Sequence, residues 1–262
     1  MNILDRIVRD KRKEVELKKE LTPVPLLERF PLFERQTNSL AYALKQSGSS
    51  GIIAEHKRRS PSKSVINQSL SVQEVALGYQ NAGVAGMSVL TDLKYFGGAL
   101  EDILLVRGSV QLPVLRKEFI IDPFQIVEAK AYGADVILLI AAILSRTEIK
   151  SLSETAKGLG LDVLLEVHNE AELQKSLMPS LDMLGVNNRD LKTFEVSLDT
   201  SRELSKQIPD DFVKVSESGI SNVEAIQDLR SYGYSGFLVG EHFMKTENPG
   251  EHALEFIKAL NV

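Results

Sequence analysis

The segment Gly51-Ile-Ile-Ala-Glu-His-Lys-Arg-Arg-Ser-Pro-Ser62 joins a short apolar run to an abruptly polar continuation. The apolar part predicts a buried strand. Side chains alternate between faces along a strand, so Glu55 and Lys57 point the same way. An acid and a base on one face of a buried strand are costly unless that end of the strand opens into a site. Because ligands of α/β proteins bind at the carboxyl ends of the strands, we expect a functional site here.

The same pattern, an apolar run followed by polar residues, recurs along the chain. Eight runs are rich in β-forming residues, and helical segments lie between them. Eight strands, each followed by a helix, predict an α/β protein built as a single closed (β/α)8 TIM barrel. An open doubly wound sheet is the alternative, because periodicity alone does not show closure. The runs lie near residues 51–56, 85–90, 112–117, 135–140, 162–167, 181–187, 213–217 and 236–239.

Local signals indicate where the helices begin and end. Residues 71–74, 145–148 and 221–224 each place a serine three positions before a glutamate, which is the spacing of a capping box. Asp122 precedes Pro123, a residue that suits the first position of a helix. Glycines stand where three helices should end, at Gly83, Gly133 and Gly158.

Residues 1–48 precede the alternation and predict an N-terminal helical extension packed on a barrel formed by residues 49–262. Residues 1–20 carry the apolar stripe of an amphipathic helix. Three prolines between residues 23 and 31 predict a loop, and residues 39–46 predict a second short helix. Two interpretations remain open for the extension: it covers the bottom of the barrel, or it forms a flap beside the ligand.

Composition excludes several classes of protein. The chain has 262 residues, a formal net charge of −5 and no cysteine. The acidic balance, with no basic tract, argues against a nucleic-acid partner. The lack of cysteine excludes disulfides and thiol catalysis and fits a cytoplasmic protein. The amino terminus lacks the apolar core of a signal peptide, and no run is long enough to span a membrane. A monomer and a weak homodimer are both compatible with the sequence.

Charged and amide side chains follow five of the predicted strands, those numbered 1, 3, 5, 6 and 7. Any one of them alone is more typical of a solvated turn. Alternation places each of them on the face of an apolar strand residue, and five such strand ends favour a shared site. If those faces point inward, one mouth collects Glu55, Lys57, Lys117, Glu166, Asn187, Arg189 and Glu217.

The last two strand ends indicate a phosphorylated ligand. Ser218-Gly219 and Gly240 precede short helical starts, and glycine lets backbone amides approach an anion closely. Barrels often bind phosphate with the loops that follow strands 7 and 8. A single glycine after a strand is common in turns, but the pair favours a phosphate site.

Other residues have a structural interpretation beside the functional one. The loop of residues 91–98 carries Tyr95 and Phe96, which either tuck against a helix or lie on a planar substrate as a lid. We expect packing or supporting roles for His56 and His168. We expect solvated side chains for Arg58 and Arg59.

Taken together, the motifs closely resemble those of indole-3-glycerol phosphate synthases, from the amino terminus nearly to the end of the chain. The resemblance is carried by Ile3-Leu-Asp-Arg-Ile-Val, Glu55-His-Lys-Arg-Arg-Ser-Pro-Ser-Lys, Leu90-Thr-Asp, Phe96-Gly-Gly, Arg116-Lys-Glu-Phe, Leu165-Glu-Val-His, Gly185-Val-Asn-Asn-Arg-Asp-Leu191 and Ser216-Glu-Ser-Gly-Ile. It implies a tryptophan-pathway carboxy-lyase that works without metal or organic cofactor. Its substrate is 1-(2-carboxyphenylamino)-1-deoxyribulose 5-phosphate, which closes to indole-3-glycerol phosphate with loss of carbon dioxide and water.

The resemblance also implies residue roles. Lys117 is similar to the general acid of ring closure, and a lysine crowded by other cations can have its pKa lowered towards neutrality. Glu166 is similar to the acid/base of dehydration, with Lys57 sharing proton transfer and Glu55 in support. The remaining implied contacts are Asn187, Arg189, Ser60, Phe96, Phe119 and Glu217 for the substrate, and Lys57, Ser218, Gly219, Gly240 and Glu241 for its phosphate.

Two positions depart from the family pattern. Ser64 stands where glycine is common, which stiffens the loop after the first strand. His242 stands where a small residue is usual, which crowds the phosphate. Two alternatives also stay open: a phosphosugar isomerase on a related barrel, which leaves Arg189 and the aromatic lid unexplained, and a barrel that binds phosphorylated ligands without turnover.

Overall fold

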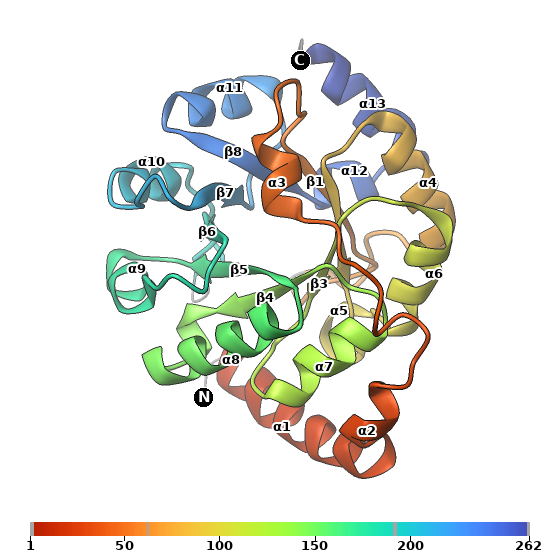
Figure 1. Ribbon diagram of the computed structural model, residues 1–262. Coiled ribbons are helices and arrows are strands. Elements are labelled where there is room, and N and C mark those ends of the chain that lie inside the picture. The colour runs from red at the N-terminus through yellow and green to blue at the C-terminus, as the bar shows by residue number, and fades with distance from the viewer. Residues whose placement is uncertain (1–2, 62, 191–192, 261–262) are drawn as a thin grey trace.

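The eight strands close into a parallel barrel in chain order (Figure 1). The computed structural model describes residues 3–61, 63–190 and 193–260, so Ser62 and Leu191 of the motifs above lie outside the described residues. β1 pairs with both β2 and β8, which confirms the (β/α)8 barrel and excludes an open sheet. The strands are β1 (Ile52–His56), β2 (Gly86–Leu90), β3 (Val114–Lys117), β4 (Val136–Ile140), β5 (Asp162–Val167), β6 (Met183–Asn187), β7 (Val213–Glu217) and β8 (Tyr234–Val239).

A ring of helices surrounds the barrel. The capping boxes of α4 and α8 and the Asp122–Pro123 start of α7 are confirmed. The predicted cap of α11 is wrong by one residue, because the side chain of Asn222, not Ser221, accepts the amide hydrogen of Ala225. The helices after β1 are α4 (Val72–Ala82), α5 (Leu93–Phe96), α6 (Glu101–Ser109), α7 (Pro123–Ala131), η1 (Ala141–Ile143), α8 (Arg146–Gly158), α9 (Glu170–Ser176), α10 (Asp199–Ser205), α11 (Val223–Ser231), α12 (Glu241–Met244) and α13 (Pro249–Ala259).

Three helices precede the first strand: α1 (Ile3–Leu21), α2 (Val24–Leu27) and α3 (Leu40–Lys45). The short α2 lies where the prolines predict a loop. That prediction is wrong because Pro23 caps the helix and Pro25 lies in its first turn, where a missing amide hydrogen costs nothing.

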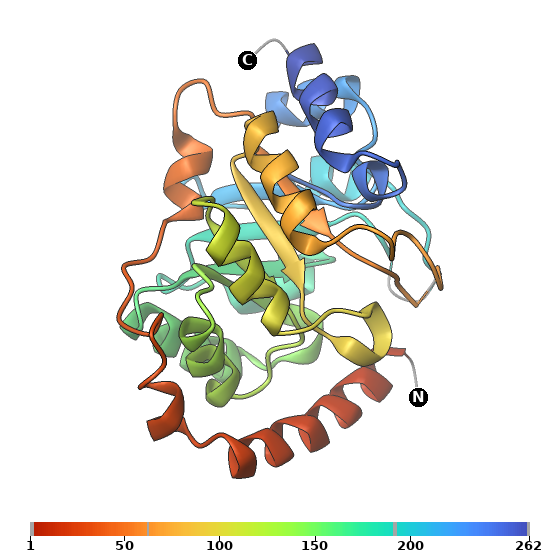
Figure 2. The same cartoon turned by 90° about the vertical axis from the view of Figure 1, so that its right-hand side faces the viewer.

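Two helices of this segment, α1 and α3, reach opposite ends of the barrel (Figure 2). α3 covers the end where the strands begin: Leu40 packs against Gly86, and Asp162 accepts hydrogen bonds from Ser39 and the amide of Ala41. α1 runs along the outside, and its amino-terminal end reaches the end where the strands finish. The interpretation as a cover for the bottom of the barrel therefore fits α3. The interpretation as a flap beside the ligand fits α1.

An apolar layer fills the half of the barrel where the strands begin. It forms the floor of the other half, where the strands finish. Ile53, Leu115, Leu164 and Val215 belong to this layer. Two residues further along the same strands stand Glu55, Lys117, Glu166 and Glu217, which therefore point inward just above the floor. Among the described residues, no helix is long and apolar enough to cross a membrane.

Candidate active site

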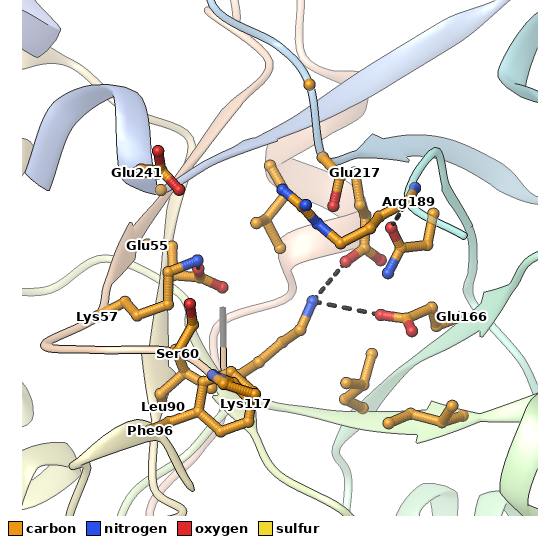
Figure 3. Close-up of a pocket in the computed structure, with 18 of the residues that line it drawn as sticks. Glu55, Lys57, Ser60, Leu90, Phe96, Lys117, Glu166, Arg189, Glu217 and Glu241 are labelled. Carbon is orange, nitrogen blue, oxygen red and sulfur yellow. Dashed lines mark hydrogen bonds and ion pairs between the residues drawn. The ribbon is translucent and has the colours of Figure 1, made fainter. Parts of the chain in front are cut away.

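A cavity of about 360 Å³ opens at the carboxyl ends of the strands (Figure 3). The structure brings together in it every site residue that the sequence predicts. Apolar residues of the floor and of α1 complete the wall, so the cavity is polar towards the strand ends and apolar beside α1. Its predicted residues are Glu55, Lys57, Ser60, Phe96, Lys117, Phe119, Glu166, Asn187, Arg189, Glu217, Ser218, Gly219, Gly240 and Glu241.

The centre of the cavity is a group of five charged side chains, called here the Lys117 cluster: Lys117, Lys57, Glu55, Glu166 and Glu217. The ammonium of Lys117 donates to Glu217 Oε2 and lies 3.5 Å from Glu166 Oε2 (Figure 3). Lys57 Nζ lies 2.9 Å from Glu55 Oε1. All three carboxylates are buried. Two ammonium groups therefore face three carboxylates in a space that excludes most water.

These three carboxylates contradict the expectation that the pKa of Lys117 is lowered. Burial alone would lower the pKa of its ammonium, but the carboxylates of Glu217, Glu166 and Glu55 outweigh burial, and the pKa is raised above its ordinary value. The expectation of a lowered pKa is wrong because the neighbours of Lys117 are anions and not cations. Lys117 is therefore fully protonated at neutral pH.

Glu217 carries the opposite perturbation. Burial raises its pKa to about 7; Lys117 pulls the pKa down, but the nearby carboxylates of Glu166 and Glu55 push it up again. Gly185 leaves space for this side chain, since a methyl group there would overlap Glu217 Oε1. Gly240 does the same for Glu55, whose Oε1 lies 2.6 Å from where a side chain on Gly240 would begin. Both glycines serve the buried carboxylates.

Glu166 is held from three sides. Lys117 lies near Oε2, His168 Nε2 lies 3.4 Å from Oε1, and Asn187 adds a hydrogen bond. Burial alone would raise the pKa of Glu166, but Lys117 and His168 outweigh it and lower the pKa. Asn187 is itself fixed, because its Oδ1 accepts the amide hydrogen of Arg189 at 3.0 Å. Glu166 is therefore an ionised and oriented carboxylate.

The predicted phosphate end contains consecutive left-handed residues and one acidic side chain. Ser218 and Gly219 have φ of 67° and 80°, so both lie in the left-handed region that few non-glycine residues adopt. Glu241, at the start of α12, forms an ion pair with Lys63 of the loop after β1. That pair neutralises the carboxylate that would otherwise repel an anion.

The two aromatic residues after β2 point to different places. Phe96 lines the cavity with its ring centroid 6.0 Å from that of Phe119. Tyr95 instead donates its hydroxyl to Asp10 of α1 at 2.6 Å. Phe96 therefore takes the position expected of a substrate wall, and Tyr95 the one expected of a ring tucked against a helix.

Several residues that line or support the cavity were not predicted from the sequence. Ile3, Leu4 and Ile7 of α1 line the cavity. Lys11 is buried beneath them, with its ammonium 3.0 Å from Asp92 and 3.1 Å from Glu118. The available signal was a lysine on the apolar stripe of an amphipathic helix, four residues after Ile7.

The expectation of a solvated Arg58 is wrong. Its guanidinium turns away from the cavity and pairs with the buried carboxylate of Asp102 in α6. Arg59 likewise donates to the backbone carbonyls of Leu93 and Lys94. Sequence alternation could not find these partners, because they lie about 40 residues further along the chain.

The two departures from the family pattern have different surroundings. Ser64 is exposed in the loop after β1. His242 lines the cavity, but its Nε2 lies 3.0 Å from Nε2 of His252 in α13, and its ring packs near Phe256. His242 is thus anchored to the outer helix ring.

A family model and several similar relatives found by comparison carry the same name. The family model described as "Indole-3-glycerol phosphate synthase" matches residues 4–256. A protein of that name from Bacteroides thetaiotaomicron is 46% identical over 259 residues, covering 99% of both chains. One from Salinibacter ruber is 46% identical over 261 residues, covering 99% of this chain and 96% of the relative.

Solved structures of lower identity share the fold. A crystal structure of 3-hexulose-6-phosphate synthase from Salmonella typhimurium is 16% identical, with a TM-score of 0.65 over 80% of this chain and 98% of that one. At this identity the likeness concerns the barrel architecture alone.

Proposed function

The chain belongs to the indole-3-glycerol phosphate synthase family, and we propose how its own residues divide the work of that enzyme's reaction. The enzyme is a carboxy-lyase of tryptophan biosynthesis. It converts 1-(2-carboxyphenylamino)-1-deoxyribulose 5-phosphate to indole-3-glycerol phosphate with loss of carbon dioxide and water. Three events need protein groups: closure of the ring, loss of the carboxylate and loss of a hydroxyl.

Lys117 is the acid of ring closure. The aromatic carbon that bears the carboxylate attacks the substrate carbonyl carbon, and the carbonyl oxygen must gain a proton as its double bond opens. The Lys117 ammonium is protonated at neutral pH and lies at the centre of the cavity. Glu217 touches the same nitrogen and has a pKa of about 7, which suits it to return the proton afterwards.

Glu166 is the base of dehydration. Carbon dioxide leaves first, and the electrons of the broken bond restore the aromatic ring. A proton must then leave the intermediate while its hydroxyl departs as water. Glu166 is ionised and faces the same space as Lys117, so it accepts that proton. Lys57, held by Glu55, protonates the departing hydroxyl.

The remaining cavity residues orient the substrate. Phe96 and Phe119 enclose the aromatic ring, and Arg189 holds its carboxylate beside the apolar floor. A cation next to an apolar surface binds the carboxylate yet favours its loss as a neutral gas. Ser60 and Glu217 contact the substrate chain. The phosphate lies at Ser218, Gly219 and Gly240, with Lys57 and Glu241 nearby.

The 3.5 Å separation of Lys117 Nζ from Glu166 Oε2 carries this proposal. Lys117→Met and Glu166→Gln should each reduce kcat by about 10²–10⁴-fold, the usual contribution of a positioned acid or base. The appearance of indole fluorescence on mixing with substrate measures turnover. Lys150→Met and Glu154→Gln, on the exposed face of α8, are the matched controls. A near-normal rate in either site variant would remove that residue from its role.

We extend the proposal to the setting of the enzyme. The acidic charge of −5 and the lack of cysteine support a cytoplasmic enzyme with no nucleic-acid partner and no membrane partner. A monomer or weak homodimer suffices, because the cavity is built from residues of one chain. The division into an extension of residues 1–48 and a barrel of residues 49–262 remains part of the same proposal.

A further inference from the structure

His168 lies beside Glu166, near the carboxylate oxygen that Lys117 does not approach. It follows β5, and its ring stands between two carboxylates. Nε2 lies 3.4 Å from Glu166 Oε1, and Nδ1 lies 3.2 Å from Oε2 of Glu172 in α9. The same Glu172 oxygen accepts the backbone amide hydrogen of His168 at 2.9 Å. Glu172, His168 and Glu166 therefore form a continuous line from the helix layer to the cavity.

The two ring nitrogens of His168 are in different states. Nδ1 is satisfied by Glu172, which fixes the proton of a neutral ring on that atom. Nε2 is buried and makes no hydrogen bond with any described residue. A buried polar atom without a partner is rare and calls for an explanation. Here its lone pair faces a carboxylate oxygen, and both atoms are acceptors while Glu166 is ionised.

One proton between Nε2 and Glu166 Oε1 would satisfy both atoms. In the proposed function Glu166 gains such a proton each time it acts as the base of dehydration. We infer that His168 is a positioning residue that takes this proton from Glu166 while dehydration takes place, so that the carboxylate does not hold the proton during the step; the inference rests on the proposed function. The O–H bond of Glu166 breaks, an N–H bond forms at Nε2, and the imidazole becomes an imidazolium between two carboxylates.

The surrounding charges favour this direction of transfer. Burial alone would lower the pKa of His168, but Glu172 and Glu166 outweigh it and raise the pKa, with a smaller contribution from Glu217. The pKa of Glu166 is lowered by Lys117, and by His168 once its ring carries the proton. Facing the pair are thus Glu172 of α9, Glu217 of β7, Lys117 of β3 and the uncharged Asn187 of β6. The imidazolium returns its proton to solvent past Glu172, which is partly exposed.

Three substitutions separate this role from simple packing. His168→Asn keeps a donor for Glu172 but removes Nε2. His168→Gln places an amide near Glu166 that cannot be protonated. Glu172→Gln keeps the ring and its acceptor but removes the charge that supports the imidazolium. Glu170→Gln, in the same first turn of α9 and exposed, is the matched control for the lost charge.

Single-turnover experiments should follow carbon dioxide release and indole fluorescence together. Both His168 variants should release carbon dioxide at close to the wild-type rate, while indole formation slows by about 10–100-fold, less than for loss of the base itself. The decarboxylated intermediate then accumulates. Glu172→Gln should shift the acid limb of the indole step to lower pH, because the pKa of His168 falls. Glu170→Gln should leave that limb in place.

Each other outcome contradicts the inference. If both steps slow equally in the His168 variants, the residue only supports the structure. If neither step slows, the proton leaves Glu166 by another route. Should the His168 variants not fold, an unmoved acid limb in Glu172→Gln decides against the relay. Glu166→Gln in the same assay tests the proposed function separately: if its indole step is normal, the role of Glu166 itself is wrong.

Discussion

Charge balance around Lys117 governs the chemistry that individual side chains can perform. Two ammonium groups and three carboxylates leave one negative charge in excess, and the substrate brings further negative charge to the cavity. An uncompensated carboxylate in a buried site is costly, so one of the three keeps a proton. Glu217 is that residue, with its pKa raised to about 7. Below about pH 7 the cluster thereby holds a neutral acid beside the protonated Lys117.

This assignment predicts how stability depends on pH. Between about pH 4.5 and 7 folded Glu217 holds a proton that the unfolded chain has lost, so the free energy of unfolding should fall as pH rises through this window. A shift of this size corresponds to about 3 kcal/mol. Glu217→Gln should remove that decline, measured by urea unfolding from pH 4.5 to 7.5. Glu154→Gln should keep it, and parallel curves for wild type and Glu217→Gln would refute the assignment.

Single residues were predictable from strand alternation but their electrostatic partners were not. Alternation placed Glu55, Lys117 and Glu166 inside the barrel, and all three line the cavity. It could not show that Lys117 meets Glu217, 100 residues away in the chain. The prediction that the pKa of Lys117 is lowered was therefore wrong. Side-chain direction is a local property of a strand, whereas a pKa depends on the folded neighbourhood.

Helix α1 joins the extension to the cavity through a buried ionic contact. The ammonium of Lys11 lies between Asp92 and Glu118. Asp92 caps α5, the short helix that carries Phe96, and Glu118 accepts the amide hydrogen of Phe119 at 2.8 Å. One lysine of α1 therefore ties together the loops that present both aromatic walls. An amphipathic pattern predicted this helix, but not the end of the barrel that it serves.

Replacing Lys11 with methionine tests this connection. Lys11→Met should lower the free energy of unfolding by about 3–5 kcal/mol, because it leaves two buried carboxylates without their partner. Surviving protein should show a raised KM, since Phe96 and Phe119 lose their common support, and a smaller change in kcat. Urea unfolding and steady-state kinetics measure the two effects. Lys13→Met, on the exposed side of α1, should change neither, and a normal KM in Lys11→Met would show that the aromatic walls are held independently.

The barrel as a whole depends on a closure that the sequence could suggest but not show. Strand and helix periodicity located the eight units, because each repeats a local pattern. Closure instead requires the first and last units to meet, which no local pattern records. In the structure β1 pairs with β8, and α4 packs against α13 on the outside (Figure 1). At this seam Gly78 and Gly250 allow the two helix backbones to approach closely.

The seam makes a prediction about the stability of the entire fold. A methyl group on Gly250 would begin 2.5 Å from the Cα of Gly78, so Gly250→Ala must push the two helices apart. We expect it to lower the free energy of unfolding by about 1–3 kcal/mol, measured by urea unfolding, with kcat unchanged below the transition because the cavity lies elsewhere. Gly108→Ala is the matched control: it is also a helical glycine, but apart from its chain neighbours and its own helix backbone no described atom lies within 4 Å of the added methyl group. That substitution should raise stability by roughly 0.5–1 kcal/mol, the usual preference of a helix for alanine. A gain of the same size in Gly250→Ala would mean that the helices separate without cost, and that strand pairing alone closes the barrel.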